Sequence, residues 1–191
     1  MEEKKYQIVM CDPPWKYNDK RGQSTDYGSA EAHYPTMTLD ALKNIKVPAA
    51  DDCALFMWAT MPMLPEALEL INSWGFSYRT CAFVWIKTTG STRHYFQGLG
   101  SWTASNAELC LLGTKGNIKR HRELKHGSEG VSQIIEAPVT KHSKKPNEVR
   151  KRIVKLMGDL PRIELFAREQ ADGWAVFGND PNLTKQEKLN K

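Results

Sequence analysis

Positions 12–15 read DPPW, an acid, two prolines and a tryptophan that directly follow the apolar run YQIVMC. Proline has no backbone N–H and fixes its own φ at about −65°. A proline also keeps the residue before it extended, so Asp12 and Pro13 are both expected to be extended. The segment is therefore predicted to be stiff, and to hold a carboxylate, a backbone carbonyl and an aromatic ring in a fixed arrangement.

This arrangement suits chemistry on an aromatic exocyclic amine, such as N6 of adenine. The lone pair of such an amine is delocalised into the ring, which makes the nitrogen a poor nucleophile. If Asp12 accepts one N–H and the carbonyl of Pro13 accepts the other, the lone pair becomes available to an electrophile, such as a methyl group on a sulfonium. Trp15 would stack on the base, and the fixed acceptors would supply electrostatic preorganisation. The simpler alternative is a rigid turn with a buried tryptophan.

The elements that must position this segment alternate between strand and helix. Apolar or β-branched runs predict strands, and apolar residues at 3.6-residue spacing predict helices. Thr38 and Pro146 are expected to begin helices, and Gly75 and Gly158 to end them. The predicted strands are 6–10, 53–60, 77–87, 107–116, a short one around 131–136, 162–168 and 173–180, and the predicted helices are 39–45, 64–75 and 147–158. This alternation predicts an α/β sheet covered on both faces. Ligands of open α/β sheets bind at the carboxyl ends of the strands, where Asp12 would lie.

Length and composition predict a single domain over residues 1–191, with an ordered core at about 6–180 and a polar tail at 181–191. No basic-then-apolar leader and no apolar run long enough to span a membrane is visible, so we expect a cytoplasmic protein without a membrane partner. The four cysteines occur singly, which favours reduced thiols over disulfides, and the five histidines show no ligand spacing. No metal site is predicted.

The net charge of +5 is unevenly distributed. Segment 115–126 holds five Lys or Arg and one Glu, which sums to +4, and segment 141–155 holds seven and one, which sums to +6, so the remainder sums to −5. Such clusters are typical of a face that binds nucleic acid, although a solvated surface gives the same pattern. Lys119 and Arg120 in the first cluster are candidate phosphate contacts.

Two loops are long enough to grip nucleotides beside a target base. These are the polar stretch 16–35 and the segment 89–106, which carries Arg93, Tyr95, Phe96 and Trp102. An enzyme that modifies a base must flip it out of a duplex or use a single strand. Cationic and aromatic side chains suit the flanking nucleotides, although aromatic residues in loops also pack locally.

Four motifs in a fixed order give the chain a family resemblance. DPPW at 12–15, HSKKPNEV at 142–149, IELFAR at 163–168 and GWAVFGND at 173–180 resemble the MT-A70 family of S-adenosylmethionine-dependent N6-adenine methyltransferases. The resemblance runs from Tyr6 to about Asp180. It implies a class I (Rossmann-like) methyltransferase fold: a mixed, mostly parallel sheet with helices on both faces and the catalytic motif before the cofactor motifs. The absence of G-x-G-x-x-G implies that no glycine-rich loop of that type holds the cofactor.

The resemblance also assigns roles to residues. Asp12, Pro13, Pro14 and Trp15 would hold the target adenine beside the methyl donor, and Tyr34 matches an aromatic of the active-site loop. The implied cofactor-binding residues are Lys145, Glu164, Phe166, Arg168, Gln170, Asn179 and Asp180. On charge grounds Glu164 suits the ribose hydroxyls and Lys145 the methionine carboxylate. The alternatives are purely structural roles: Lys145 only precedes a helix, Arg168 only pairs with Glu164, and Phe166 belongs to the core.

The predicted substrate is DNA, because the chain lacks the flanking regions of the family's RNA enzymes. An RNA N6-adenosine methyltransferase and a nucleic-acid-binding subunit of a methyltransferase complex are the alternatives. A cytosine N4 methyltransferase would typically carry Ser at position 12, and a catalytically dead subunit would usually lack the acid or the aromatic of the motif. Sequence specificity would come from the loops, from a second copy of the chain, or from a partner subunit.

Overall fold

The computed structural model describes residues 4–16, 36–90, 94–98, 100, 102–121, 130–140 and 144–178. Within this part, seven strands form one sheet in the order β5-β3-β4-β2-β1-β6-β7. The strands are β1 (Tyr6–Cys11), β2 (Ala49–Ala59), β3 (Ser77–Thr88), β4 (Ala107–Lys115), β5 (Ile134–Pro138), β6 (Arg162–Leu165) and β7 (Ala175–Phe177). The helices are α2 (Leu39–Lys43), α3 (Leu64–Ser73) and α4 (Glu148–Met157), with 3-10 turns η2 (Met61–Met63) and η3 (Ile118–His121).

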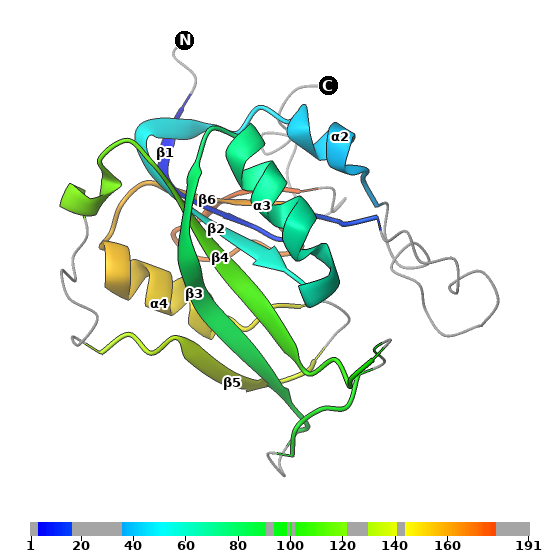
Figure 1. Cartoon of the computed structure of the whole chain (residues 1–191). Helices are drawn as coiled ribbons and strands as arrows, with labels where there is room; N and C mark the ends of the chain where they lie inside the picture. Colours follow the sequence, from blue (N-terminus) through cyan, green and yellow to red (C-terminus); the bar gives the residue numbers. More distant parts are fainter. Residues whose placement is uncertain are drawn as a thin grey trace.

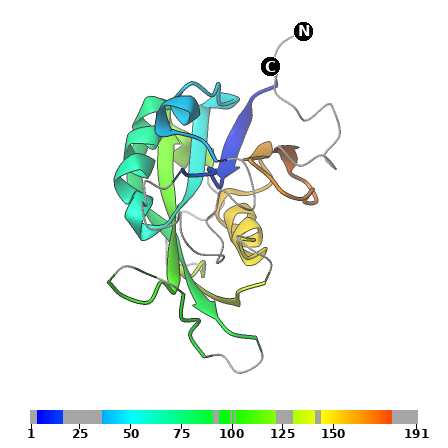
Figure 2. The ribbon, with the colours of Figure 1, turned by 90° about the vertical axis from the view of Figure 1, so that its right-hand side faces the viewer.

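The sheet is mixed and mostly parallel, as the sequence predicts. Strand β4 runs antiparallel to both of its neighbours, β2 and β3, whereas every other adjacent pair is parallel. Helices α2 and α3 cover one face and α4 covers the other (Figures 1 and 2). This is the architecture of a class I, Rossmann-like fold.

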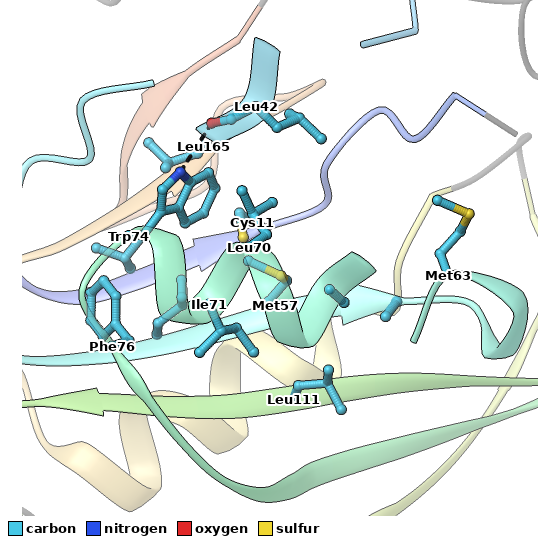
Figure 3. Packing of buried hydrophobic residues seen from close by; sticks show 14 of the residues in the cluster. Cys11, Leu42, Met57, Met63, Leu70, Ile71, Trp74, Phe76, Leu111 and Leu165 are labelled. Carbon is cyan, nitrogen blue, oxygen red and sulfur yellow. Dashed lines mark hydrogen bonds between the residues drawn. The ribbon is translucent and has the colours of Figure 1, made fainter. Parts of the chain in front are cut away.

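Strand β2 shows why both faces must be covered. Its residues 53–59 are all buried: the odd-numbered positions pack into the core on the α3 face, and positions 54, 56 and 58 pack into the core on the α4 face. A strand buried on both sides reads as a continuous apolar run, because it has no solvent face. Figure 3 shows the core on the α3 face, in which the indole Nε1 of Trp74 donates to the carbonyl of Leu42 at 3.0 Å.

The helix ends follow the predicted signals. Thr38 caps α2, because its Oγ1 accepts a hydrogen bond from the backbone N–H of Ala41 at 3.2 Å. Gly75 and Gly158 follow α3 and α4 with φ of 78° and 84°, a conformation that favours glycine. Helix α4 buries Val149, Ile153 and Met157 four residues apart, which fixes the side that faces the sheet.

Candidate active site

The carboxyl ends of three parallel strands form the candidate site. Asp12 directly follows β1, and the register pairs Cys11 with Met57 on β2 and with Leu165 on β6. The carboxyl ends of β1, β2 and β6 therefore meet at one edge of the sheet, as predicted for Asp12. In β4, which runs the other way, the first residues reach the same edge, and Glu108 lies there.

The DPPW segment is fixed by its own backbone hydrogen bonds. The N–H of Trp15 donates to the carbonyl of Pro13 at 2.8 Å, and the N–H of Met37 donates to the carbonyl of Pro14 at 2.8 Å. A carbonyl oxygen has two lone pairs, so that of Pro13 keeps one for a substrate amine. The side chain of Trp15 is only 5% exposed and packs into the core on the α3 face. The segment is thus a rigid turn with a buried tryptophan, and stacking of Trp15 on a base stays a prediction.

A chain of alternating buried charges starts at Asp12. Lys145 Nζ lies 2.9 Å from Asp12 Oδ2 and 3.1 Å from Glu108 Oε2. Lys87 Nζ lies 2.6 Å from Glu108 Oε1. All four side chains are less than a fifth exposed, at 19% for Asp12, 12% for Lys145, 9% for Glu108 and 14% for Lys87. Two acids and two ammonium groups make the chain neutral, which such burial requires.

Burial and neighbouring charges set the protonation of this chain. Burial raises the pKa of Asp12, and the negative charge of Glu108 adds to this, while Lys145 opposes it. Burial alone would also raise the pKa of Glu108, but Lys145 and Lys87 together hold it below its ordinary value. Burial would lower the pKa of Lys145, but Asp12 and Glu108 outweigh it and raise that pKa. Lys145 therefore stays charged between its two carboxylates.

A second buried ion pair lies beside the first. Arg150 on α4 binds both oxygens of Glu164 on β6, with Nε at 2.8 Å from Oε2 and Nη2 at 3.0 Å from Oε1. Arg150 Nη1 also donates to Asn147 Oδ1 at 2.5 Å and to Glu169 Oε1 at 3.4 Å. Arg150 is therefore an ion-pair partner of Glu164, whereas the sequence had suggested only Arg168 for that role. Burial raises the pKa of Glu164, and the guanidinium of Arg150 opposes that rise.

The chain leaves β6 through a strained residue. Phe166 has φ of 60° and is the one non-glycine residue with positive φ within the described ranges. This conformation is costly for a bulky side chain, and such residues cluster at functional sites. Phe166 packs half-buried against the core on the α3 face, as one alternative proposed, and its backbone redirects the chain beside Glu164.

The structure brings some of the predicted residues together. Asp12, Lys145 and Glu164 lie at the same edge, and Arg168 follows the carboxyl end of β6 by three residues. The positive charge of Arg168 opposes the rise in the pKa of Asp12 that burial causes. Gln170 lies in the segment 166–174 that links β6 to β7, where its amide donates to the carbonyl of Trp174 at 2.8 Å. Tyr34, Arg93, Asn179 and Asp180 lie outside the described residues.

The predicted nucleic-acid contacts are divided between the two ends of the sheet. Tyr95 and Trp102 follow the carboxyl end of β3 and are 57% and 99% exposed, whereas Phe96 is half-buried. Lys119 and Arg120 lie in η3, where Arg120 Nη2 binds Asp52 Oδ2 at 2.6 Å. Asp52 precedes Met57, the β2 partner of Cys11, by five residues, or about 17 Å of strand. The structure therefore does not bring Lys119 and Arg120 to the edge that carries Asp12.

Sequence reasoning missed Glu108, Lys87 and Arg150. The first two carried a usable signal, because a charge inside an apolar run, as in AELCLLG and FVWIKT, needs a buried partner. Arg150 gave no such signal, because it lies within a run of basic residues.

Replacing Arg150 with Met is expected to destabilise the fold by about 3 kcal/mol at neutral pH, because removing one partner strands a buried charge. Without the guanidinium, burial raises the pKa of Glu164 further, so Glu164 protonates in the folded state as the pH falls. The difference in unfolding free energy should then shrink toward acid pH in urea titrations. The double variant Arg150→Met/Glu164→Gln should recover most of the loss, and the exposed Lys151→Met should cost less than about 0.5 kcal/mol. A loss independent of pH would contradict the pairing.

Comparisons with known proteins agree with the geometry. The MT-A70 family model matches residues 6–180. "Type II methyltransferase M.MunI" of a Mycoplasma species is 38% identical in an alignment 191 positions long, which covers 92% of this chain and 77% of that protein. The human "N(6)-adenosine-methyltransferase catalytic subunit METTL3" is 31% identical over 180 residues, and the Arabidopsis thaliana "N(6)-adenosine-methyltransferase MT-A70-like" is 30% identical over 179. The chain covers only 28% and 24% of those two proteins. No helix in the described part of the chain is long and apolar enough to cross a membrane.

Proposed function

Since the chain belongs to the MT-A70 family and is a methyltransferase, we propose that it methylates N6 of adenine in DNA, with S-adenosylmethionine as the methyl donor. One observation carries the proposal. Asp12 lies at the carboxyl end of the central strand β1, in a turn stiffened by two prolines and within 2.9 Å of the ammonium of Lys145. This is where an open α/β sheet binds its ligands.

The residues at the edge fit the proposed donor. S-adenosylmethionine supplies an electrophilic methyl group, a carboxylate and a ribose with two hydroxyls. The buried ammonium of Lys145 suits the carboxylate. Glu164 suits the hydroxyls even though Arg150 binds both of its oxygens, since each carboxylate oxygen has a second lone pair.

The protein's part in the reaction is to prepare the amine. The carboxylate of Asp12 accepts one N–H of adenine N6 and the carbonyl of Pro13 accepts the other. Both acceptors are fixed before the substrate arrives, so the nitrogen lone pair is directed without reorganisation of the site. The methylated nitrogen must lose a proton, and Asp12 is its acceptor because burial raises the pKa of this carboxyl.

DNA is the proposed substrate because the relative named a type II methyltransferase aligns over most of its own length, 77%, with this chain. RNA is the second candidate, favoured by the relatives named N(6)-adenosine-methyltransferases, although the chain spans only about a quarter of them. The four cysteines of this chain form no disulfide, which supports the reducing cytoplasm as the compartment in which it acts. Sequence specificity would come from segments 16–35 and 89–106, from a second copy of the chain, or from a partner subunit.

The test is methyl transfer from labelled S-adenosylmethionine to duplex DNA, single-stranded DNA and RNA, with products identified by nucleoside mass spectrometry. N6-methyladenine in DNA is the expected product. Methylation of RNA alone would show that RNA and not DNA is the substrate. Methylated cytosine would contradict the proposed role of Asp12 in binding adenine N6. If no nucleic acid is methylated although the donor binds, the chain acts only as part of a complex.

A further inference from the structure

A concave site adjoins the catalytic edge, and its lining includes Gln170, one of the predicted cofactor-binding residues. It is a groove of about 850 Å³ between α4 and residues 169–174, the latter half of the link between β6 and β7. Figure 2 shows α4 beside this link on the sheet face away from α3. Parallel neighbours are usually joined through a helix, but the link 166–174 contains none. The flank of α4 is therefore left open, and we call this space the α4 groove.

The lining of the α4 groove is predominantly cationic. Its charged members are Arg150, Lys151, Lys155, Arg162, Glu169 and Asp172, four cations against two acids. Glu169 lies 2.8 Å from Lys144 and 3.4 Å from Arg150, Arg150 in turn binds Glu164, and Arg162 Nη1 lies 2.6 Å from Asp159. These pairs neutralise one another, so the charge that the groove offers to a ligand comes from Lys151 and Lys155, against Asp172. Lys151 and Lys155 are exposed and one helical turn apart on the same flank of α4. Lys155 Nζ donates to the carbonyl of Gly130 at 3.1 Å, and an ammonium group has three donors, so two remain for a phosphate. Val154, Ala171 and Trp174 add apolar lining between the charges.

The α4 groove is continuous with the catalytic edge. Asn147 lines the groove and is two residues from Lys145, which binds Asp12. Arg150 lines the groove and at the same time holds Glu164. In contrast, the basic residues of η3 are at the opposite end of the sheet, and Arg120 there is bound to Asp52 at 2.6 Å. The two basic clusters of the sequence are therefore not equivalent.

We propose that the α4 groove binds phosphate groups of the nucleic-acid strand on one side of the target base. This inference rests on the proposed function and adds the path of the substrate. A base that enters the catalytic edge brings its flanking phosphates with it, and a cationic track that begins at that edge neutralises them. Lys151 and Lys155 are the principal phosphate contacts, and η3 is off the path.

The test measures binding of a fluorescein-labelled, adenine-containing oligonucleotide, single-stranded and duplex, across a series of salt concentrations. Lys151→Gln/Lys155→Gln should weaken binding at least tenfold at low salt. Each phosphate contact contributes about 0.7 to 0.9 to the slope of log affinity against log salt, so the slope should lose about 1.4 to 1.8. The matched control Lys4→Gln/Lys5→Gln removes the same charge at the exposed amino end of β1 and should change the slope by less than half as much.

Equal losses in both variants would show a general charge effect and overturn the proposal, as would a loss only on Lys119→Gln. Thermal unfolding and affinity for S-adenosylmethionine should be unchanged in the groove variant, because both lysines are exposed. The two proposals fail separately. Groove-dependent binding without methyl transfer would refute only the proposed function, whereas transfer with unaltered binding in the groove variant would refute only the groove.

Discussion

Replacing Asp12 with Asn should lower the rate of methyl transfer by about 10²–10³-fold, the cost of removing one preorganised polar group from the site of charge development. The amide keeps the size of the side chain but has only one acceptor oxygen, and it cannot take the proton that N6 must lose. If that oxygen accepts from the ammonium of Lys145, which lies 2.9 Å from a carboxylate oxygen in the native site, the NH2 group is left to face the donor N–H of N6. The loss should therefore fall on the chemical step.

Single-turnover rates on the preferred substrate and calorimetric affinity for S-adenosylmethionine would separate chemistry from binding. The affinity of Asp12→Asn should stay within a few-fold of the native value, because Glu164 and Arg150 are untouched and Glu108 still binds the ammonium of Lys145 at 3.1 Å. Asp40→Asn is the matched control, since that carboxylate is 92% exposed on α2. If Asp12→Asn keeps more than a tenth of the native rate, a carboxylate at this position is not required.

Local signals account for what the sequence could predict. The apolar run before Asp12, the cap at Thr38 and the glycines after α3 and α4 each act within a few residues, and all of them hold in the structure. Several strand boundaries shifted. Strand β2 begins at Ala49 and not at 53, and β7 covers Ala175–Phe177 and not 173–180. Strand β5 was expected around 131–136 and forms at Ile134–Pro138, and β6 ends at Leu165 because Phe166 adopts a positive φ.

The pairing of the buried charges could not be predicted in the same way. Lys145 binds Asp12 across 133 residues of sequence, and the shared partner Glu108 comes from a strand that runs antiparallel to its neighbours. A charged residue in an apolar run shows that a partner exists, but only the register of the sheet shows which one. Similarly, charge counting treats the basic runs around positions 120 and 150 alike, and only the topology separates them.

The pairing of the buried charges can be tested at Glu108, because its carboxylate binds the ammonium groups of both Lys87 and Lys145. Glu108→Gln should destabilise the fold by about 3–5 kcal/mol at pH 7, since buried Lys87 would lose the carboxylate that it binds and Lys145 would keep only that of Asp12. The folded-state pKa of Glu108 is below its ordinary value, so its stabilisation is complete above the unfolded pKa of about 4.3 and is lost as the pH falls through the folded pKa. The native protein should therefore lose its advantage over the variant below about pH 4.

Urea unfolding at several pH values between 3 and 8 would measure this difference. Lys87→Met/Glu108→Gln removes one charge of each sign and leaves Asp12 with Lys145, so it should recover much of the stability that Glu108→Gln loses. A difference that does not depend on pH, or a double variant no more stable than the single one, would show that Glu108 contributes by packing alone. Affinity for S-adenosylmethionine should follow the same order, because Lys145 can serve the cofactor only while its neighbours hold it in place.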